Sequence, residues 1–215
     1  MRALATVLSL CLFAPLAIAD GGPEPGWEAS AAVRSAPALA PIGAEDVPAR
    51  CGAIAKRTFA PSPGQALSAR IALAGCIADA RLAPLSLIDG QESVLAIEGA
   101  VVPAFHLLDG VVDAGDPSMK VIALRAKADL FAQMCTRMMN TVPPPADTSA
   151  EAAALRETRR QIVDGMTQDW RAHAREAHQA VVDLGKRHPE LQRNPVVQAA
   201  IRDSARQLAE SLASS

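Results

Sequence analysis

The stretch that decides the fold is 116–142, which reads DPSMKVIALRAKADLFAQMCTRMMNTV. Its apolar residues recur at alternating steps of three and four positions, which places them on one stripe of a helix. Asp116 is a natural N-cap, Pro117 fits the first helical turn, and the prolines that begin at Pro143 end the helix. The stripe consists of Val121, Leu124, Ala128, Phe131, Cys135, Met138 and Val142.

Phe131 stands at the centre of this stripe and is predicted to anchor the core. Its neighbour one turn earlier, Ala128, is small, so another helix can approach closely and cover the ring. The preceding segment is apolar almost all round and carries Phe105, which makes it the expected partner. Arg171, by contrast, is expected on a solvated face.

Composition favours helices over strands along the whole chain. Aromatic residues make up 3% of the sequence and tyrosine is absent, whereas alanine and leucine are abundant. The sequence therefore predicts an all-α protein with about six helices in three antiparallel hairpins. These helices are expected to form one domain over residues 46–215.

The first 45 residues are expected to lie outside that domain. Arg2 precedes a short apolar run that ends at Ala17-Ile18-Ala19, a small-x-small cleavage pattern, so residues 1–19 are predicted to be a signal peptide. Residues 20–45 are rich in Gly, Pro and Ala and are predicted to be a disordered leader, in which Trp27 either docks on the domain or stays solvated. The mature protein is therefore expected in the periplasm or outside the cell, without a transmembrane span.

Net charge gives no argument for nucleic-acid binding. The full chain carries −2, and removal of Arg2 with the predicted signal peptide leaves −3. The segment from Arg156 to Arg193 mixes both signs, which indicates a solvated face and not a basic patch.

The other helices follow from caps, prolines and apolar spacing. They are expected at 47–59, 63–82, 89–112, 149–188 and from 195 onward. Pro103 is expected to kink the third of these, which is apolar enough for a core or a membrane; its polar residues favour the core. The predicted caps are Ser62, Asp89 with Glu92, Thr148 with Glu151, and Asn194. The last helix is expected to bury Val197, Ile201, Ala205 and Leu208.

The final third weakly resembles a tetratricopeptide unit. Ala177, Val181, Leu184 and the closing Pro189 are similar to the second helix of that repeat, although the Trp-Leu-Gly-Tyr pattern of the first helix is missing. The resemblance implies a helical hairpin, and a peptide-binding groove only if the repeat is complete. A plain helical hairpin is the alternative.

Three cysteines follow the predicted signal peptide. Cys51 and Cys76 fall on consecutive helices at similar distances from the turn between them, so a disulfide is predicted there. Cys135 then stays a small apolar core residue. The alternatives are another of the three possible pairings, or three reduced thiols. A redox catalyst is not indicated, because no Cys-x-x-Cys is present.

Two sequence patterns are candidates for a metal-binding site. His173 and His178 are five positions apart, about 140° around a helix, so they do not share a metal as two His four apart do; they are expected to be surface histidines. The second pattern is a soft-ligand cluster that could hold Cu(I), although the same residues continue the apolar stripe. That cluster consists of Met134, Cys135, Met138 and Met139.

Function is constrained mainly by what is missing. No serine-hydrolase elbow, phosphate loop or dinucleotide fingerprint occurs, and an unrecognised hydrolase would rest on Glu98, His106 and Asp109 alone. The two latter residues are expected to pair with each other. The sequence therefore predicts a non-catalytic helical binding or scaffold protein with an unknown protein partner and no cofactor. Soft-metal binding is the first alternative and hydrolysis the second.

Overall fold

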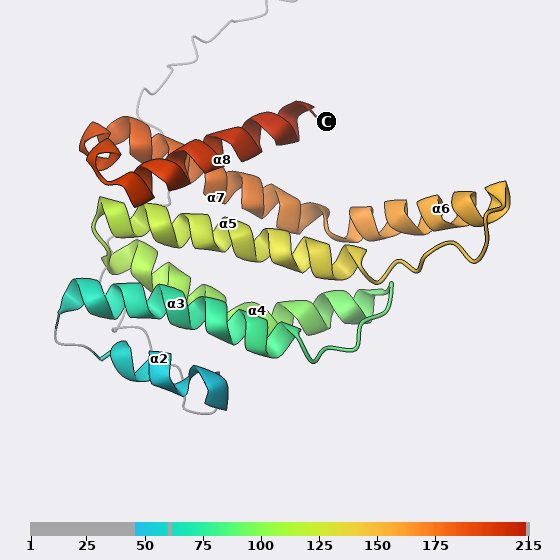
Figure 1. The fold of residues 1–215 in the computed structure, drawn as a ribbon, viewed down its shortest axis with the longest axis horizontal. Helices are drawn as coiled ribbons and strands as arrows, with labels where there is room; N and C mark the ends of the chain where they lie inside the picture. Colours follow the sequence, from blue (N-terminus) through green and yellow to red (C-terminus); the bar gives the residue numbers. More distant parts are fainter. Residues whose placement is uncertain (1–45, 60–61, 214–215) are drawn as a thin grey trace, which may run out of the picture. The chain divides into compact units, whose positions relative to one another are not determined.

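A computed structural model describes residues 46–59 and 62–213, so the predicted signal peptide and leader, with Trp27, lie outside the described residues. The described part is helical and contains no strand, which confirms the all-α prediction (Figure 1). It consists of η2 (Ala49–Cys51), α2 (Gly52–Arg57), α3 (Pro63–Leu82), α4 (Gln91–Ala114), α5 (Pro117–Met139), α6 (Ala150–Met166), α7 (Gln168–Arg187), η3 (Pro189–Arg193) and α8 (Pro195–Ala213).

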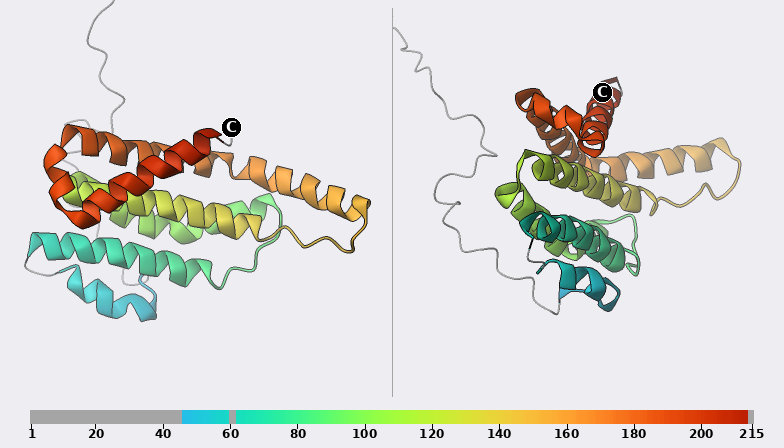
Figure 2. Two further views of the ribbon diagram at one scale, coloured as in Figure 1. Left: turned by 45° about the horizontal axis from the view of Figure 1, so that its top comes forward. Right: turned by 60° about the vertical axis from the view of Figure 1, so that its left-hand side comes forward.

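The helix α5 is the central element. It contacts α3 and α4 on one side and α7 and α8 on the other, and it also touches α6. The helices α3, α4 and α5 run antiparallel in turn and stack side by side (Figures 1 and 2). The helices α6 and α7 follow one another in the same direction, so that α7 returns along α5, and α8 runs antiparallel to α7. Asp116 caps α5 through a 2.9 Å hydrogen bond from the Met119 N–H, as predicted.

Five of the seven predicted stripe residues of α5 are buried, and Phe131 and Cys135 are the two that are not. Met134 and Leu130 are buried, whereas Phe131 and Cys135 are only half-buried, so Phe131 is not the core anchor. The reason is that α5 is covered on two sides, which no single narrow stripe describes. The predicted partner is confirmed, because the Phe131 ring lies 4.6 Å from the Phe105 ring of α4.

The helix α4 begins later than predicted and continues through its proline. Its N-cap is Gly90 instead of Asp89, and Ser93 accepts a hydrogen bond from the Ile88 N–H before the helix begins. Pro103 is buried within an uninterrupted helix. By length and composition α4 could cross a membrane, as core helices of soluble proteins also could. Here its apolar residues pack against α3 and α5.

The predicted helix over 149–188 is two helices. The helix is interrupted at Thr167, whose hydroxyl donates to the carbonyl oxygens of Val163 and Asp164 at 3.1 and 3.2 Å. Thr136 and Thr158 make the same kind of bond within continuous helices, so this bond by itself does not end a helix. Thr167 differs from them in being fully buried. The cap of α6 is also one residue later than predicted: Ser149, and not Thr148, accepts from the Ala152 N–H at 3.1 Å.

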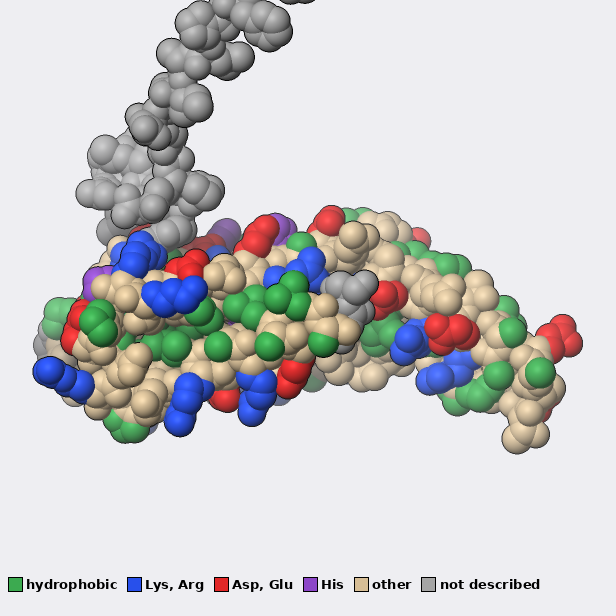
Figure 3. Space-filling model, turned by 90° about the horizontal axis from the view of Figure 1, so that it is seen from above, with side chains coloured by type: hydrophobic (Ala, Val, Ile, Leu, Met, Phe, Trp, Pro, Cys, Tyr) green, Lys and Arg blue, Asp and Glu red, His purple; other side chains and the backbone are tan. Residues whose placement is uncertain are grey.

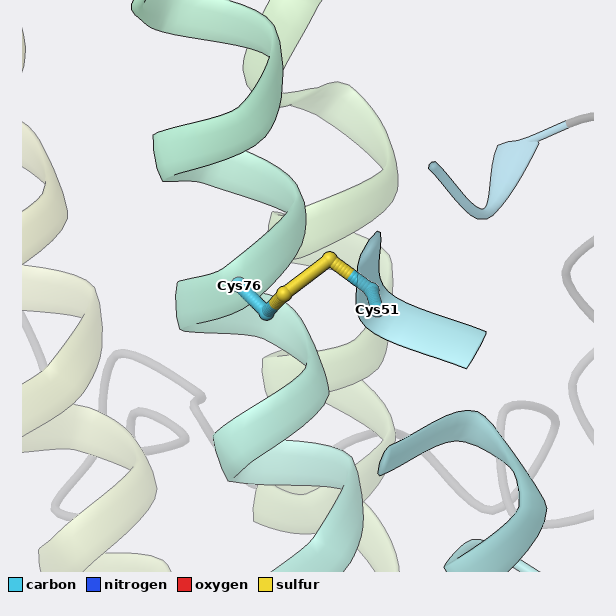
Figure 4. The surroundings of a disulfide bond; sticks show 2 residues. All are labelled: Cys51 and Cys76. Atoms are coloured by element: carbon cyan, nitrogen blue, oxygen red, sulfur yellow. A yellow bond between two sulfur atoms is a disulfide. The ribbon is translucent and has the colours of Figure 1, made fainter. Parts of the chain in front are cut away.

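The first helical segment is tied to α3 by the predicted disulfide. In place of one helix over 47–59, η2 and the short α2 occupy this stretch. Cys51, at the end of η2, is bonded to Cys76 in the middle of α3 (Figure 4). Cys51 is fully buried with Leu73 and Ile77 in a small apolar cluster of its own.

The helix α8 crosses α7 where a glycine allows close approach. A Cβ added at Gly185 would lie 2.9 Å from Cδ1 of Ile201, so only glycine fits this crossing without a shift. Asn194 caps α8 as predicted, accepting from the Val196 N–H at 3.0 Å. The buried face differs from the prediction, because Ser204 is buried where Ala205 was expected.

Candidate interaction surface

The helix α6 lies almost entirely in solvent. Val163 is the only one of its residues that is fully buried, and it sits in the last turn before the break. The rest of α6 extends beyond the end of α5 in both views of the ribbon (Figures 1 and 2). An exposed helix of this length is marginal in water, so α6 depends on its cap and its attachment to α7.

Exposed apolar side chains gather on and beside α6. Leu155 and Ile162 are seven positions apart, so they share one stripe, and they are 56% and 52% exposed. Arg159 lies between them and approaches Asp89 of the α3–α4 loop, with 3.8 Å between Nη1 and Oδ2. That ion pair places α6 beside the segment that carries Ile88 and Leu95, which are 60% and 61% exposed. The α6 surface is defined here as Ile88, Leu95, Leu155 and Ile162.

Charges of both signs surround this surface. Arg160 pairs with Glu157 at 3.2 Å, and Arg156 donates to the Pro143 carbonyl oxygen at 3.3 Å. The face seen in Figure 3 likewise mixes acidic, basic and hydrophobic side chains. The α6 surface therefore has no field of one sign, and apolar contact is what it offers to another molecule.

The junction of α6 and α7 is held by a small polar group. The Asp164 carboxylate and carbonyl oxygen both accept from the Arg171 guanidinium across the break, so Arg171, which was predicted on a solvated face, is partly exposed and bonded. Cys135 of α5 lies beneath the junction, with its Sγ 4.0 Å from the Thr167 carbonyl oxygen. Burial raises the pKa of the Cys135 thiol, so the thiol keeps its proton at neutral pH.

The structure spreads the soft-ligand candidates over two faces of α5. Met134 and Met138 are fully buried in the main core, whereas Cys135 and Met139 are half-buried and pack at its edge. Among the described residues, no group of three or more His, Cys, Asp or Glu could hold a metal ion. A site for Cu(I) would therefore draw on Cys135 and Met139, with the thiol deprotonated on binding.

The three hydrolase candidates each have their own surroundings. Glu98 accepts from the Trp170 indole N–H at 2.9 Å, which ties α4 to α7. Asp109 binds Lys127 of α5 at 2.5 Å, and not His106 as the sequence predicted. His106 is exposed on α4. These contacts hold helices together, and they bring no acid and base onto one substrate position.

The two histidines of α7 differ in burial. His173 is exposed, as predicted, and its ring lies 5.4 Å from that of Phe131. His178 is buried, contrary to the prediction, because α8 covers it. The sequence held one signal of this: His178 precedes Val181 and Gly185 by three and seven positions, so it belongs to the apolar face of α7.

The comparisons with known proteins add nothing to this geometry. No protein-family model, no curated protein and no solved structure matches the chain.

Proposed function

We propose that the protein is a non-catalytic helical binding protein and that the α6 surface receives a protein partner through apolar contact. The observation that carries the proposal is a helix with one fully buried residue whose exposed stripe holds Leu155 and Ile162. What distinguishes Leu155 and Ile162 from the other exposed apolar residues is that they share one stripe of a helix that projects from the bundle. Burial of each side chain by a partner would contribute about 1.5–3 kcal/mol.

The proposed place of action is outside the cytoplasm. The apolar segment that ends at Ala17-Ile18-Ala19 supports export, and the Cys51–Cys76 disulfide supports an oxidising compartment. In this setting a bound partner would be another exported protein, or an exported part of a membrane protein.

Site-specific photocrosslinking tests the proposal. A photoreactive residue at position 155 of the full chain, expressed in its native host, is expected to give one adduct of defined mass. The change Ile162→Glu is expected to abolish that adduct, because a carboxylate would be buried in an apolar contact. Leu212→Glu is the control, because Leu212 is also a large apolar residue and is 76% exposed, but it lies at the far end of α8.

Two outcomes would overturn the proposal. One is the absence of any adduct at position 155. The other is an adduct that survives Ile162→Glu and is lost with Leu212→Glu, which would place the contact elsewhere. An adduct with the mass of two copies of this chain would identify self-association as the function of the surface.

A further inference from the structure

The interface of α5, α7 and α8 contains a buried polar pair in apolar surroundings. His178 of α7 is 7% exposed and Ser204 of α8 is fully buried. The Nδ1 atom of His178 lies 3.1 Å from Oγ of Ser204, within hydrogen-bonding distance. Their neighbours on the same helices, Val181 and Ala200, belong to the apolar cluster between α5, α7 and α8. Whatever changes the state of the ring therefore acts on the docking of α8.

The pair lies near the point on α8 where the buried part of the helix ends. Val197 and Ala200 bury the beginning of the helix, and Ser204 is its last fully buried residue. Beyond Ser204 the side chains are exposed or half-buried up to Ala213. The pair of His178 and Ser204 is thus the outermost fully buried contact between α8 and the helices beneath it.

The charges around the ring disfavour a second proton on it. Arg125 of α5 faces His178, and its guanidinium binds Asp129 of the same helix at 2.7 Å. On α8, Asp203 stands next to Ser204 and binds Arg206 at 3.0 Å. Both carboxylates of this group are therefore engaged by arginines. On α7 itself, Arg175 lies one turn before the ring and is exposed.

These surroundings set the sign of a pH effect. Burial, and then the positive charge of Arg125, lower the pKa of His178 below its ordinary value of 6.5. An undocked ring recovers the ordinary value and binds a proton more readily than the docked ring does. Docking of α8 is therefore fully stable above about pH 6.5 and weakens as the pH falls from there toward the pKa of the docked ring.

We propose that His178 is a proton-sensitive tie, which keeps α8 docked on α5 and α7 while its ring is neutral and frees the helix when the ring is protonated. Protonation places a second positive charge beside Arg125 in a site closed to water, and undocking returns that charge to solvent. The freed state uncovers the apolar residues that α8 covers, including Val121 and Val181.

Hydrogen exchange of the full chain, followed from about pH 7.5 to about pH 5, tests the proposal across the ordinary range of histidine. The protection factors of the α8 amides are expected to fall with a midpoint below about 6.5, while those of α3 and α4 stay constant. Each unit by which the docked pKa lies below the free one corresponds to about a tenfold loss of protection. The NMR titration of the docked His178 ring is expected to have its midpoint at the pH where that fall levels off.

Two histidine variants separate the tie from a general acid effect. His178→Gln keeps a polar group opposite Ser204 but takes no proton, so the pH step in α8 is expected to vanish. His173→Gln removes the exposed histidine of the same helix and is expected to keep the step. The proposal is overturned if wild-type α8 protection is independent of pH, or if His178→Gln retains the step. If His178→Gln does not fold, a wild-type His178 midpoint at or above 6.5 overturns it instead.

Discussion

At the residue scale, the contribution of individual α5 side chains to the free energy of unfolding can be measured by truncating each to alanine. Met134 is fully buried in the main core, whereas the Phe131 ring packs against Phe105 at the edge of that core and is partly exposed. Met134→Ala is expected to lower the free energy of unfolding by about 2–5 kcal/mol, because transfer and cavity terms add. Phe131→Ala is expected to cost less, because part of the ring is already hydrated. Urea denaturation measures both.

Arg175→Ala is the surface control for these two variants and should stay within about 0.5 kcal/mol of the wild type. A larger loss for Phe131→Ala than for Met134→Ala would contradict the burial order and restore Phe131 as the anchor.

Gly185 provides a second test at this scale, with a matched glycine elsewhere. Gly185→Ala is expected to destabilise, because the added Cβ meets three atoms of Ile201 at 2.9–3.2 Å and overpacking costs about 1–3 kcal/mol. Gly75→Ala is expected to stabilise by up to about 1 kcal/mol, because nothing lies near its added Cβ and alanine favours the helix. Thermal melts of the two variants should therefore shift in opposite directions. Equal shifts would mean that α7 and α8 cross elsewhere.

At the scale of the element, the disulfide decides how firmly α2 is held. The segment of η2 and α2 is attached to α3 by the Cys51–Cys76 bond, by the contacts of α2 with α3, and by the Asp46–Arg81 ion pair at 2.9 Å. The bond spans 25 residues, and closing such a loop is worth about 3 kcal/mol in the chain-entropy model. Cys51→Ser with Cys76→Ser is expected to lower the free energy of unfolding, measured by urea denaturation, by that amount.

Peptide mapping without reductant checks the bond itself. Recovery of Cys51 and Cys76 as free thiols from unfolded, unreduced protein would rule the bridge out, whereas Cys135 should be alkylated in every case.

The helix α6 is expected to be the least protected helix of the described part. Its backbone hydrogen bonds face water, and its only fully buried residue is Val163. Hydrogen exchange should therefore give fast exchange over 151–161 and slow exchange over the middle of α5. Protection of α6 equal to that of α5 would show that another part of the protein covers α6. Binding of a partner should also raise the protection of α6.

At the scale of the whole molecule, export is the prediction that decides where every other property operates. Cleavage after Ala19 should leave Asp20 as the first residue of the mature chain. Mass spectrometry of the exported protein is expected to show the loss of residues 1–19. Intact protein that begins at Met1 and is confined to the cytoplasm would contradict both the cleavage and the proposed compartment.

The sequence by itself determined the helical class and several of the helix ends. Asp116 and Asn194 cap the helices that they were predicted to cap, and prolines stand at or near several helix ends. The Cys51–Cys76 pairing also followed from spacing along two neighbouring helices. These features are local, because caps, prolines and hairpin spacing act over a few turns, and so they can be read without knowledge of packing.

Only the tertiary structure decided which face of each helix is covered. Met134 replaced Cys135 in the core because α5 is packed from two sides, and His178 became buried because α8 crosses α7 at Gly185. The break at Thr167 depends on the same packing, since a periodic apolar stripe continues across it in the sequence. Leu155 and Ile162 belong to that stripe, yet α6 carries them beyond α5 into solvent. Apolar spacing identifies a helix face that is stabilised by burial, and the arrangement of the other helices determines whether that face is buried.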